Sequence, residues 1–507
     1  MNIAMILDMA ADSFPERTAL QWGDDRFSYS ELRVAARVLA RHVRDAGMAH
    51  LALLDVNSPA APIAIFAAAY AGVAYAPLNY RLTHEEIKEL VARIAPACII
   101  AGPEHLARFD GRDELSVIAR DTVLAMHTAS DAEAPPLGED PHAVAVLLFT
   151  SGTTGKPKAA ILRHENLLSY IVGTVEFAAA DEQDAIAVAV PPYHIAGISA
   201  VLSSTYACRR MVQLENFDAA AWLAACREHR VSNAFLVPTM LSRVVEYLLA
   251  ADARPDLGSL RAIAYGGGKM PQSTIESAMR LFDGVDFTNA YGLTETSSTV
   301  AVLGPDEHRM AITSENPQLR RRLSSVGRAT GAVEIQVRDE AGVELPPESL
   351  GLVFVRGPQV SGEYDSLGSQ LDSGGWFPTR DRGYLDADGY LYLDGRADDV
   401  IVRGGENISP GEIEDVLLTH PAVADAAVVA IPDEQWGEAV AAAVVLKPGT
   451  RVAEQELQDL VRARLRSSRV PQAILFKSEL PYNDLGKILR RVIRQDIANA
   501  GALGAAI

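Results

Sequence analysis

An α/β fold is predicted for this chain, with a large amino-terminal domain of layered sheets and helices and a small, mobile α+β carboxy-terminal domain. Helical patterns alternate with short Val/Ile/Ala/Leu runs, which is typical of helices layered on largely parallel sheets. Apolar residues make up 49% of the 507 residues, enough for more than one core. The sequence becomes charged and glycine-containing near Gly395, so we place the domain boundary between residues 1–397 and 398–507.

The charge balance limits the class of partner. The chain carries 46 Lys and Arg against 66 Asp and Glu, a formal net charge of −20. Because a field of that sign repels polyanions, nucleic acid is not expected as a partner. An anionic ligand would have to be bound locally, by backbone amides, a metal ion or a few placed cations.

The cysteines and the amino terminus indicate a reducing compartment. Cys98, Cys208 and Cys226 contain no CxxC pair, so neither a disulfide framework nor a zinc ribbon is expected. The start MNIAMILDMA lacks the basic region of a signal peptide. Residues 56–80 are uncharged but interrupted by proline and glycine, which favours a buried helix and a strand over a membrane span. We therefore expect a cytoplasmic protein with no integral membrane segment.

A loop with phosphate-binding chemistry follows a polar connection and a strand. Residues 128–142 are rich in Pro, Gly and charge, and residues 143–149 read as an apolar strand. The string LLFTSGTTGKPKAAI then concentrates hydroxyls, amides and cations, which predicts a cradle for a polyphosphate. It is not a Walker A loop, because only two residues separate Gly152 from Gly155 and no Lys-Ser/Thr pair follows.

Two further loops also come directly after predicted strands. The string AYGGGKMP follows residues 260–264, and its glycines would let a flat ligand approach the backbone. The string NAYGLTETSS follows residues 285–288 and offers an aromatic face, a hydroxyl and a carboxylate suited to a base, a phosphate and Mg²⁺. Three such loops at successive strand ends predict a ligand crevice at one edge of an open sheet.

The carboxy-terminal part begins with a charged, glycine-containing stretch. Ser409, Pro410 and Glu412 are predicted to be the N-cap, the first helical position and the third position of a capping box. Strand-like runs at residues 426–431 and 439–446 follow, with a helix at 454–465. A terminal helix is predicted near Ile488.

Taken together, these strings resemble a known family. TSGTTGKPK, YGLTE, GWFPTRD with GYLDADGYLYLDGR, DDVIVRGGENISPGEIE and LGKILRR occur in family order from Phe149 to Arg491. The chain thus resembles the adenylate-forming acyl-CoA synthetases of the luciferase-like AMP-binding superfamily. It looks most like the compact acyl- and aryl-CoA ligases, of which 4-chlorobenzoate CoA ligase is one.

The resemblance implies a ligase that uses ATP, Mg²⁺ and CoA. A monocarboxylic acid would attack the α-phosphorus of ATP, pyrophosphate would leave, and the CoA thiol would displace AMP from the acyl-adenylate. Such chemistry depends on positioning and on neutralising the charge that develops. The acid, the pathway and the oligomeric state stay open, a homo-oligomer included.

The nucleotide site is implied residue by residue. Thr294 would contact the α-phosphate and Glu295 the Mg²⁺, while Tyr291 would stack on adenine beside Gly267 and Gly268. Asp381 and Arg396 would hold the ribose hydroxyls. The loop on the β- and γ-phosphates would comprise Thr150, Ser151, Gly152, Thr153, Thr154, Gly155 and Lys156.

Further roles are implied for the carboxy-terminal domain. Lys487 matches the family's catalytic lysine; a cation at a helix start is unfavourable, so bridging the substrate carboxylate and the α-phosphate would explain its place. Asp398 matches the hinge on which the small domain rotates. Gly404 and Gly405 would line the pantetheine tunnel. Contacts with the CoA nucleotide would come from Arg81, Trp436 and Arg469.

The acyl pocket is expected around PPYHIAG, the glycine loop and the residues after Glu295. His194 would gate that pocket or sense the nucleophile, and a packed core histidine is the alternative. Apart from Lys269 these strings show no extra cation, which favours an acid with a neutral tail.

The chain departs from the family pattern at three places. Arg380 stands beside the ribose site and Ala159 replaces a usual glycine, while residues 357–373 are irregular. Two other functions stay open: an acyl-adenylate former that serves a carrier protein, and a nucleotide-binding homologue with weakened catalysis.

Overall fold

The structure is a computed structural model that describes residues 1–109, 114–129, 138, 140–150, 158–433, 435–483 and 486–504. The chain divides into two compact units. The first comprises Met1–Ile335 with Val355–Phe377, and the second Gln336–Phe354 with Pro378–Ile507. These two units are the parts of the chain that pack most densely within themselves. The predicted boundary between residues 397 and 398 instead marks the expected hinge, and it stays a prediction.

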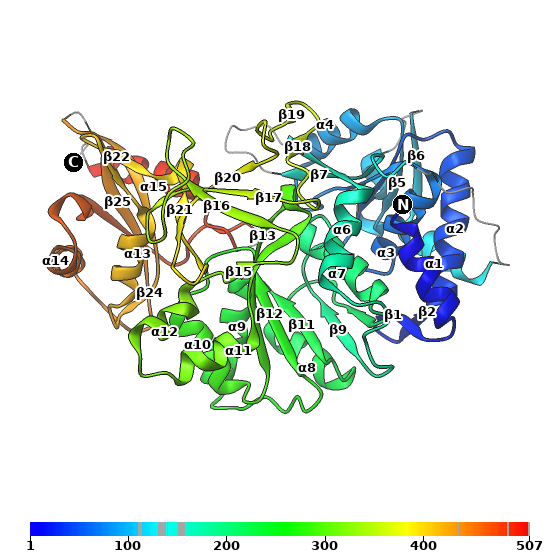
Figure 1. Ribbon diagram of the computed structural model, residues 1–507, viewed down its shortest axis with the longest axis horizontal. Coiled ribbons are helices and arrows are strands. Elements are labelled where there is room, and N and C mark those ends of the chain that lie inside the picture. Colours follow the sequence, from blue (N-terminus) through cyan, green and yellow to red (C-terminus); the bar gives the residue numbers. More distant parts are fainter. Residues whose placement is uncertain are drawn as a thin grey trace. The chain divides into compact units, whose positions relative to one another are not determined.

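Two large sheets form the framework of the first unit (Figure 1). Within the described residues, the larger sheet has nine strands, in the order β15 (Arg328–Ala329), β14 (Ser298–Leu303), β13 (Asp286–Leu293), β12 (Ala262–Gly266), β11 (Asn233–Leu236), β9 (Ala185–Val188), β10 (Arg210–Gln213), β1 (Thr18–Trp22) and β2 (Asp25–Ser28). The other has eight described strands, in the order β19 (Gly368–Ser369), β18 (Glu363–Tyr364), β8 (Lys158–Arg163), β7 (Val144–Thr150), β4 (Ala74–Pro77), β3 (His50–Leu54), β5 (Ala97–Ala101) and β6 (Leu115–Ala119).

Helices cover these sheets and complete the core of the first unit. One extensive hydrophobic cluster combines residues of α1, α2, α3 and α7 with strand residues from both sheets, and it accounts for much of the apolar content of the described chain. The helices are α1 (Ala4–Ser13), α2 (Tyr29–Asp45), α3 (Ala60–Ala71), α4 (His84–Ile94), α5 (Arg120–Ala125), α6 (His164–Thr174), α7 (Ile195–Tyr206), α8 (Ala219–Glu228), α9 (Pro238–Ala250), α10 (Gln272–Leu281), α11 (Pro305–Thr313) and α12 (Pro317–Arg321).

The second unit contains two smaller sheets. One, whose residues fall mostly in this unit, has the described strand order β16 (Glu334–Arg338), β17 (Gly351–Arg356), β20 (Phe377–Leu385) and β21 (Leu391–Arg396). The other has the described strand order β23 (Glu406–Ile408), β22 (Ile401–Arg403), β25 (Gly437–Leu446) and β24 (Val423–Asp433), and β26 (Ala473–Lys477) pairs with β25. Its helices are α13 (Pro410–Leu418), α14 (Glu454–Arg464) and α15 (Arg490–Gly504).

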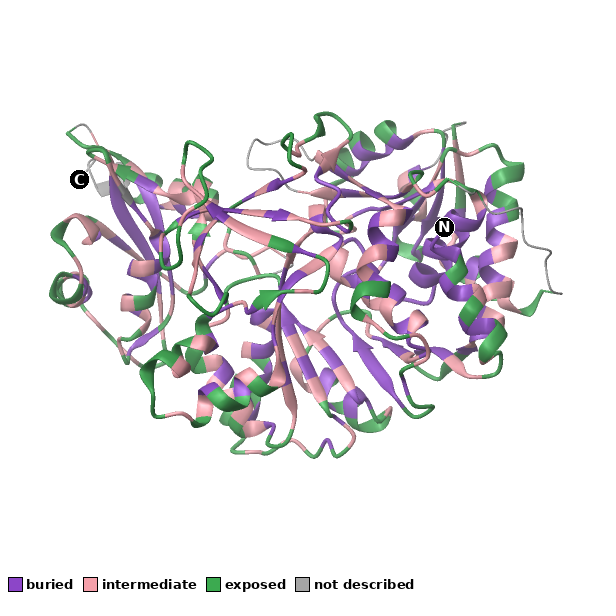
Figure 2. Cartoon of the chain, in the orientation of Figure 1, coloured by how far each residue is buried: buried purple, intermediate pink, exposed green. Residues whose placement is uncertain are grey.

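The predicted α/β class is confirmed. Residues 56–80 form the buried helix α3 and the strand β4, as expected. Figure 2 shows burial on the strands and exposure on loops and outer helix faces. In the part of the chain that the structure describes, no helix is long and apolar enough to cross a membrane. Cys98, Cys208 and Cys226 are all free and buried.

The predicted capping box before α13 is wrong in one respect. The helix begins at Pro410 with Ser409 as its N-cap, but the Ser409 hydroxyl makes no capping bond. It donates instead to the carbonyl oxygen of Asp394, at 3.0 Å. Glu412 pairs with Arg469, so a tertiary partner has replaced the local one.

Candidate active site

Three predicted loops of the first unit leave the same edge of the nine-stranded sheet. Strands β9, β11, β12 and β13 are neighbours and run parallel, so their carboxyl ends lie together. The loop PPYHIAG follows β9, the glycine loop follows β12, and Thr294 follows β13. Gly266 pairs with Ala290, which puts the glycine loop beside Tyr291. The structure therefore brings these predicted loops together, at the position where open sheets bind ligands.

Tyr291, Thr294 and Glu295 lie at a tight turn. Tyr291 is buried near the end of β13, and Thr294 and Glu295 open a single 3₁₀ turn, η3 (Thr294–Thr296). A Cβ on Gly292 would lie 1.8 Å from the carbonyl oxygen of Ser298, so the returning strand β14 requires glycine there. The turn thus fixes the backbone of Glu295 at the edge of the sheet.

Glu295 has an oxygen ligand set that suits Mg²⁺. Its Oε1 accepts a hydrogen bond of 2.5 Å from the Tyr364 hydroxyl, whereas Oε2 makes no hydrogen bond or ion pair with the described residues. No group of three or more His, Cys, Asp and Glu residues forms a metal site in the described chain. A single carboxylate fits Mg²⁺, which proteins often bind through one or two carboxylates together with substrate phosphates.

The strands on both sides of the phosphate loop are described, but most of the loop is not. Thr150 ends β7 and pairs with Lys158, the first residue of β8, and its hydroxyl donates to the Lys158 carbonyl oxygen at 3.3 Å. Strand β8 contacts η3, which brings the exit of the loop beside Glu295. The predicted phosphate ligands that lie outside the described residues are Ser151, Gly152, Thr153, Thr154, Gly155 and Lys156.

His194 and Arg81 are described in the first unit. His194 precedes α7, and its ring lies 4.5 Å from the ring of Tyr193. Tyr193 in turn contacts Tyr80, whose ring lies under the Arg81 guanidinium at 5.6 Å. An aromatic group thus links the two predicted residues, but their roles toward acyl group and CoA stay predictions.

Asp381 and Arg396 of the second unit form an ion pair. They face each other across β20 and β21, with Arg396 Nη1 2.9 Å from Asp381 Oδ1. Arg380 has a φ of +62°, and its exposed side chain lies 3.6 Å from Asp398 instead of beside the Asp381 carboxylate. The extra cation therefore points toward the predicted hinge residue, and alternation along the strand keeps it off the buried Asp381.

Lys487 is exposed and precedes α15, which begins three residues later than Lys487, at Arg490. The prediction that it lies at the helix start is therefore wrong by about one turn. Its amide donates to Asn483 Oδ1 at 2.8 Å, and the Asn483 amide donates to its carbonyl oxygen at 2.9 Å. Tyr482, beside Asn483, donates to Asp425 of β24. The backbone of the lysine is thus anchored to the sheet.

The predicted CoA-binding residues of the second unit have structural partners. Gly404 and Gly405 form the turn between β22 and β23 with φ of +57° and +84°, which the two-residue hairpin requires. A Cβ on Gly404 would lie 2.7 Å from the ring of Trp436, whose side chain is exposed. Arg469 forms ion pairs with Glu406 and Glu412, and its hydrogen bond lowers the pKa of the Glu406 carboxyl.

Sequence reasoning missed Tyr364 and Asn483. Tyr364 lies in the irregular segment 357–373, where no motif marks it, and only its place in the fold shows its contact with Glu295. Asn483 stands four residues before Lys487, a spacing that could have indicated a turn.

Comparison with known proteins finds relatives of the predicted family along most of the chain. Residues 7–365 match the family described as AMP-binding enzyme, and residues 412–487 match the AMP-binding enzyme C-terminal domain. The chain is 31% identical to an indoleacetate–CoA ligase of Aromatoleum aromaticum, over 98% of each protein.

Two solved structures are similar in fold. One is the o-succinylbenzoate CoA synthetase MenE of Bacillus subtilis in complex with its acyl-adenylate intermediate (TM-score 0.82, 30% identity, 96% of this chain and 97% of that one). The other is the amide bond synthetase McbA of Marinactinospora thermotolerans (TM-score 0.85, 28% identity, 98% and 99%). The predicted family is confirmed: the chain belongs to the AMP-binding enzymes.

Proposed function

We propose that this chain is an ATP-dependent acid–CoA ligase that activates a monocarboxylic acid as acyl-AMP, releases pyrophosphate and transfers the acyl group to CoA. The observation that carries the proposal is the meeting of Tyr291, Thr294 and Glu295 with the glycine loop at one sheet edge. A flat base, a phosphate and a cation each find a suitable partner there.

The residues of the chain act by positioning and by charge. Tyr291 and Gly267–Gly268 hold adenine, and Thr294 orients the α-phosphate toward the acid. Glu295 would hold Mg²⁺, whose charge would neutralise the phosphate oxygens. Asp381 and Arg396 hold the ribose, and Lys487 brings the carboxylate and α-phosphate together against their repulsion.

The thioester step takes the remaining residues. Rotation at Asp398 would exchange Lys487 for the turn at Gly404 and Gly405 beside the acyl-adenylate. Arg81, Trp436 and Arg469 would then contact the CoA nucleotide, and His194 would lie at the acyl pocket. The cytoplasm is the proposed location, since three free thiols suit a reducing compartment.

Aromatic acids are the first substrates to test. The indoleacetate and o-succinylbenzoate enzymes named above both act on acids that carry a ring. The assay is pyrophosphate release with ATP, Mg²⁺ and a panel of aromatic, short-chain and long-chain acids, followed by AMP formation on addition of CoA. Absence of pyrophosphate release with every acid would contradict the proposal.

A second acceptor deserves the same assay, because one similar structure is an amide bond synthetase. An amine would attack the same acyl-adenylate and give an amide in place of a thioester. Acyl-adenylate that is consumed on addition of an amine, but not of CoA, would favour this function. Acyl-adenylate that is consumed only on addition of an acyl carrier protein would favour the alternative function, in which the acyl group passes to a carrier protein.

A further inference from the structure

The irregular segment 357–373 contacts Glu295 at both its backbone carbonyl and its side-chain carboxylate. We propose that residues 359–365, here called the brace, position the Glu295 carboxylate for Mg²⁺·ATP and that Tyr364 is the positioning residue within it. The inference rests on the proposed function, since it deepens the role of Glu295. It assigns a task to a segment in which sequence patterns indicate no functional residue.

The brace holds Glu295 at both of its ends. The amides of Ser361 and Gly362 donate to the Glu295 carbonyl oxygen at 2.9 and 3.1 Å. The Tyr364 hydroxyl donates to carboxylate Oε1. A side chain fixed at its backbone and at one of its two oxygens has little rotamer freedom left, so Oε2 keeps one direction toward a ligand.

The brace also stabilises the strained turn that follows Glu295. Ser297 and Ser298 have φ of +55° and +119°, values that cost a serine free energy. Gln359, 5% exposed, donates from Nε2 to the carbonyl oxygens of Thr296 and Thr299 at 3.0 and 2.8 Å. The strain persists because the brace satisfies the backbone oxygens on both sides of these two serines.

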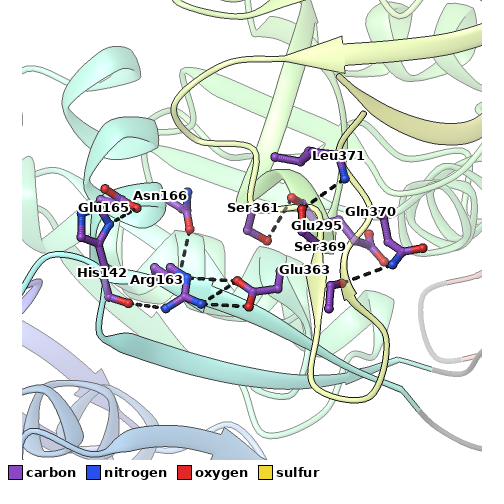
Figure 3. A network of polar contacts seen from close by, with 11 residues as sticks. His142, Arg163, Glu165, Asn166, Glu295, Ser361, Glu363, Ser369, Gln370 and Leu371 are labelled. Carbon is purple, nitrogen blue, oxygen red and sulfur yellow. Dashed lines mark hydrogen bonds and ion pairs between the residues drawn. The ribbon is translucent and has the colours of Figure 1, made fainter. Parts of the chain in front are cut away.

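A second set of contacts anchors the brace to the strand that leaves the phosphate loop. Arg163 of β8 binds Glu363 through two nitrogens, at 2.7 to 3.0 Å, as Figure 3 shows. Asp365 exchanges bonds with Ala159: its amide donates to the Ala159 carbonyl oxygen, and its carboxylate accepts from the Ala159 amide. The brace thus joins β8 to Glu295 through hydrogen bonds and ion pairs on both sides.

The charged side chains beside the brace suit an anionic ligand bound together with a metal cation. Lys158, at the exit of the phosphate loop, lies 5.9 Å from the centre of the Tyr364 ring. The side chains of Arg163 and Glu363 are 29% and 24% exposed, so water screens their pair only in part. Tyr364 thus pairs with Ala160 of β8 through its backbone and contacts the Glu295 carboxylate through its hydroxyl, which couples the position of β8 to that of the carboxylate.

The test replaces Tyr364 by phenylalanine and measures the metal directly. Mn²⁺ stands in for Mg²⁺, and electron paramagnetic resonance counts free Mn²⁺ in the presence of the full-length protein and ATP. Removal of a group that orients a metal ligand typically weakens metal binding by about 10-fold or more, and we expect Tyr364→Phe to do so. The half-saturating Mg²⁺ concentration for pyrophosphate release should rise equally, with a smaller change in rate at saturation.

The direction in which Mn²⁺ affinity changes distinguishes two roles of the Tyr364 hydroxyl: orienting the carboxylate, or only withdrawing charge from it. A hydroxyl that only drew charge from Oε1 would tighten Mn²⁺ binding when removed, whereas a positioning hydroxyl weakens it. Glu363→Gln, which loosens the anchor, should weaken binding in the same direction by a smaller factor. Tyr206→Phe is the matched control, because Tyr206 ends α7 and packs on Phe177.

Three results would overturn the inference, each in a different way. Unchanged or tighter Mn²⁺ binding in Tyr364→Phe, with wild-type affinity intact, refutes the brace alone. A wild-type protein that binds no Mn²⁺ with ATP contradicts the proposed function and removes the inference with it. Weaker binding in Tyr206→Phe as well would mean that loss of any tyrosine hydroxyl suffices, which also refutes the assignment.

Discussion

Glu295 and Lys487 are held in opposite ways. Glu295 lies at a sheet edge of the first unit, and hydrogen bonds fix both its carbonyl and its carboxylate. Lys487 lies on an exposed turn of the second unit, and Asn483 fixes its backbone. A carboxylate that binds a metal gains from being preorganised, because water need not be reordered during the reaction. Under the proposed function Lys487 serves only one of the two half-reactions, so residues 398–507 would have to deliver and withdraw it by rotation at Asp398.

The largest expected effect tests the lysine. Lys487→Ala should slow adenylation by about 1,000-fold, because its charge is needed where the two anions meet. Attack of CoA on supplied acyl-adenylate should stay within a few fold of wild type. Single-turnover assays of each half-reaction measure the two effects separately, and an equal loss in both would contradict the comparison.

Glu295→Gln should give the next largest change. The neutral amide keeps the shape and the Tyr364 bond but loses the charge, so we expect the half-saturating Mg²⁺ concentration to rise by at least about 10-fold. A Mg²⁺ titration of pyrophosphate release measures it. A titration curve that matched wild type would remove Glu295 from the metal site.

The hinge can be broken without touching either residue. Asp398→Pro fixes φ near about −65° and removes an amide donor, so residues 398–507 should be trapped in one orientation. We expect adenylation to survive and thioester formation to fall by roughly 10-fold or more. Asp398→Ala is the control, because it removes the 3.6 Å contact with Arg380 but leaves the backbone able to rotate. Wild-type rates in both steps of the proline variant would refute the hinge.

The smallest effect on the reaction is expected at Asp55, a buried carboxylate that is not among the proposed site residues. Burial raises the pKa of Asp55 to about 6, although Ser58 and Arg120 contact it. Since the folded state then binds the proton more tightly, this group contributes stability at low pH that is lost as pH rises through about 6.

Relative to Asp55→Asn, the wild type should therefore lose roughly 2 kcal/mol of unfolding free energy between about pH 4 and about pH 7. Urea unfolding of both proteins at several pH values measures the difference. Adenylation at neutral pH should be similar in the two proteins. A difference in unfolding free energy that does not change with pH would show that Asp55 titrates normally.

Local patterns in the sequence predicted much of the architecture and the family. The apolar runs predicted β7, β12, β13, β24 and β25, and proline at the first position predicted where α13 begins. The strings YGLTE and AYGGGKMP follow neighbouring strands, so their meeting could be inferred from parallel topology. Such features depend on residues close together in the chain, and sequence patterns report those directly.

Only the tertiary structure decided how distant groups are paired. Ser409 bonds to Asp394 instead of capping its helix, and Arg380 turns toward Asp398. Tyr364 reaches Glu295 across 69 positions of sequence, because β18 adds to the sheet beside β8. A polar side chain takes whichever partner the fold brings within about 3 Å, and that choice depends on chain paths that no local pattern records.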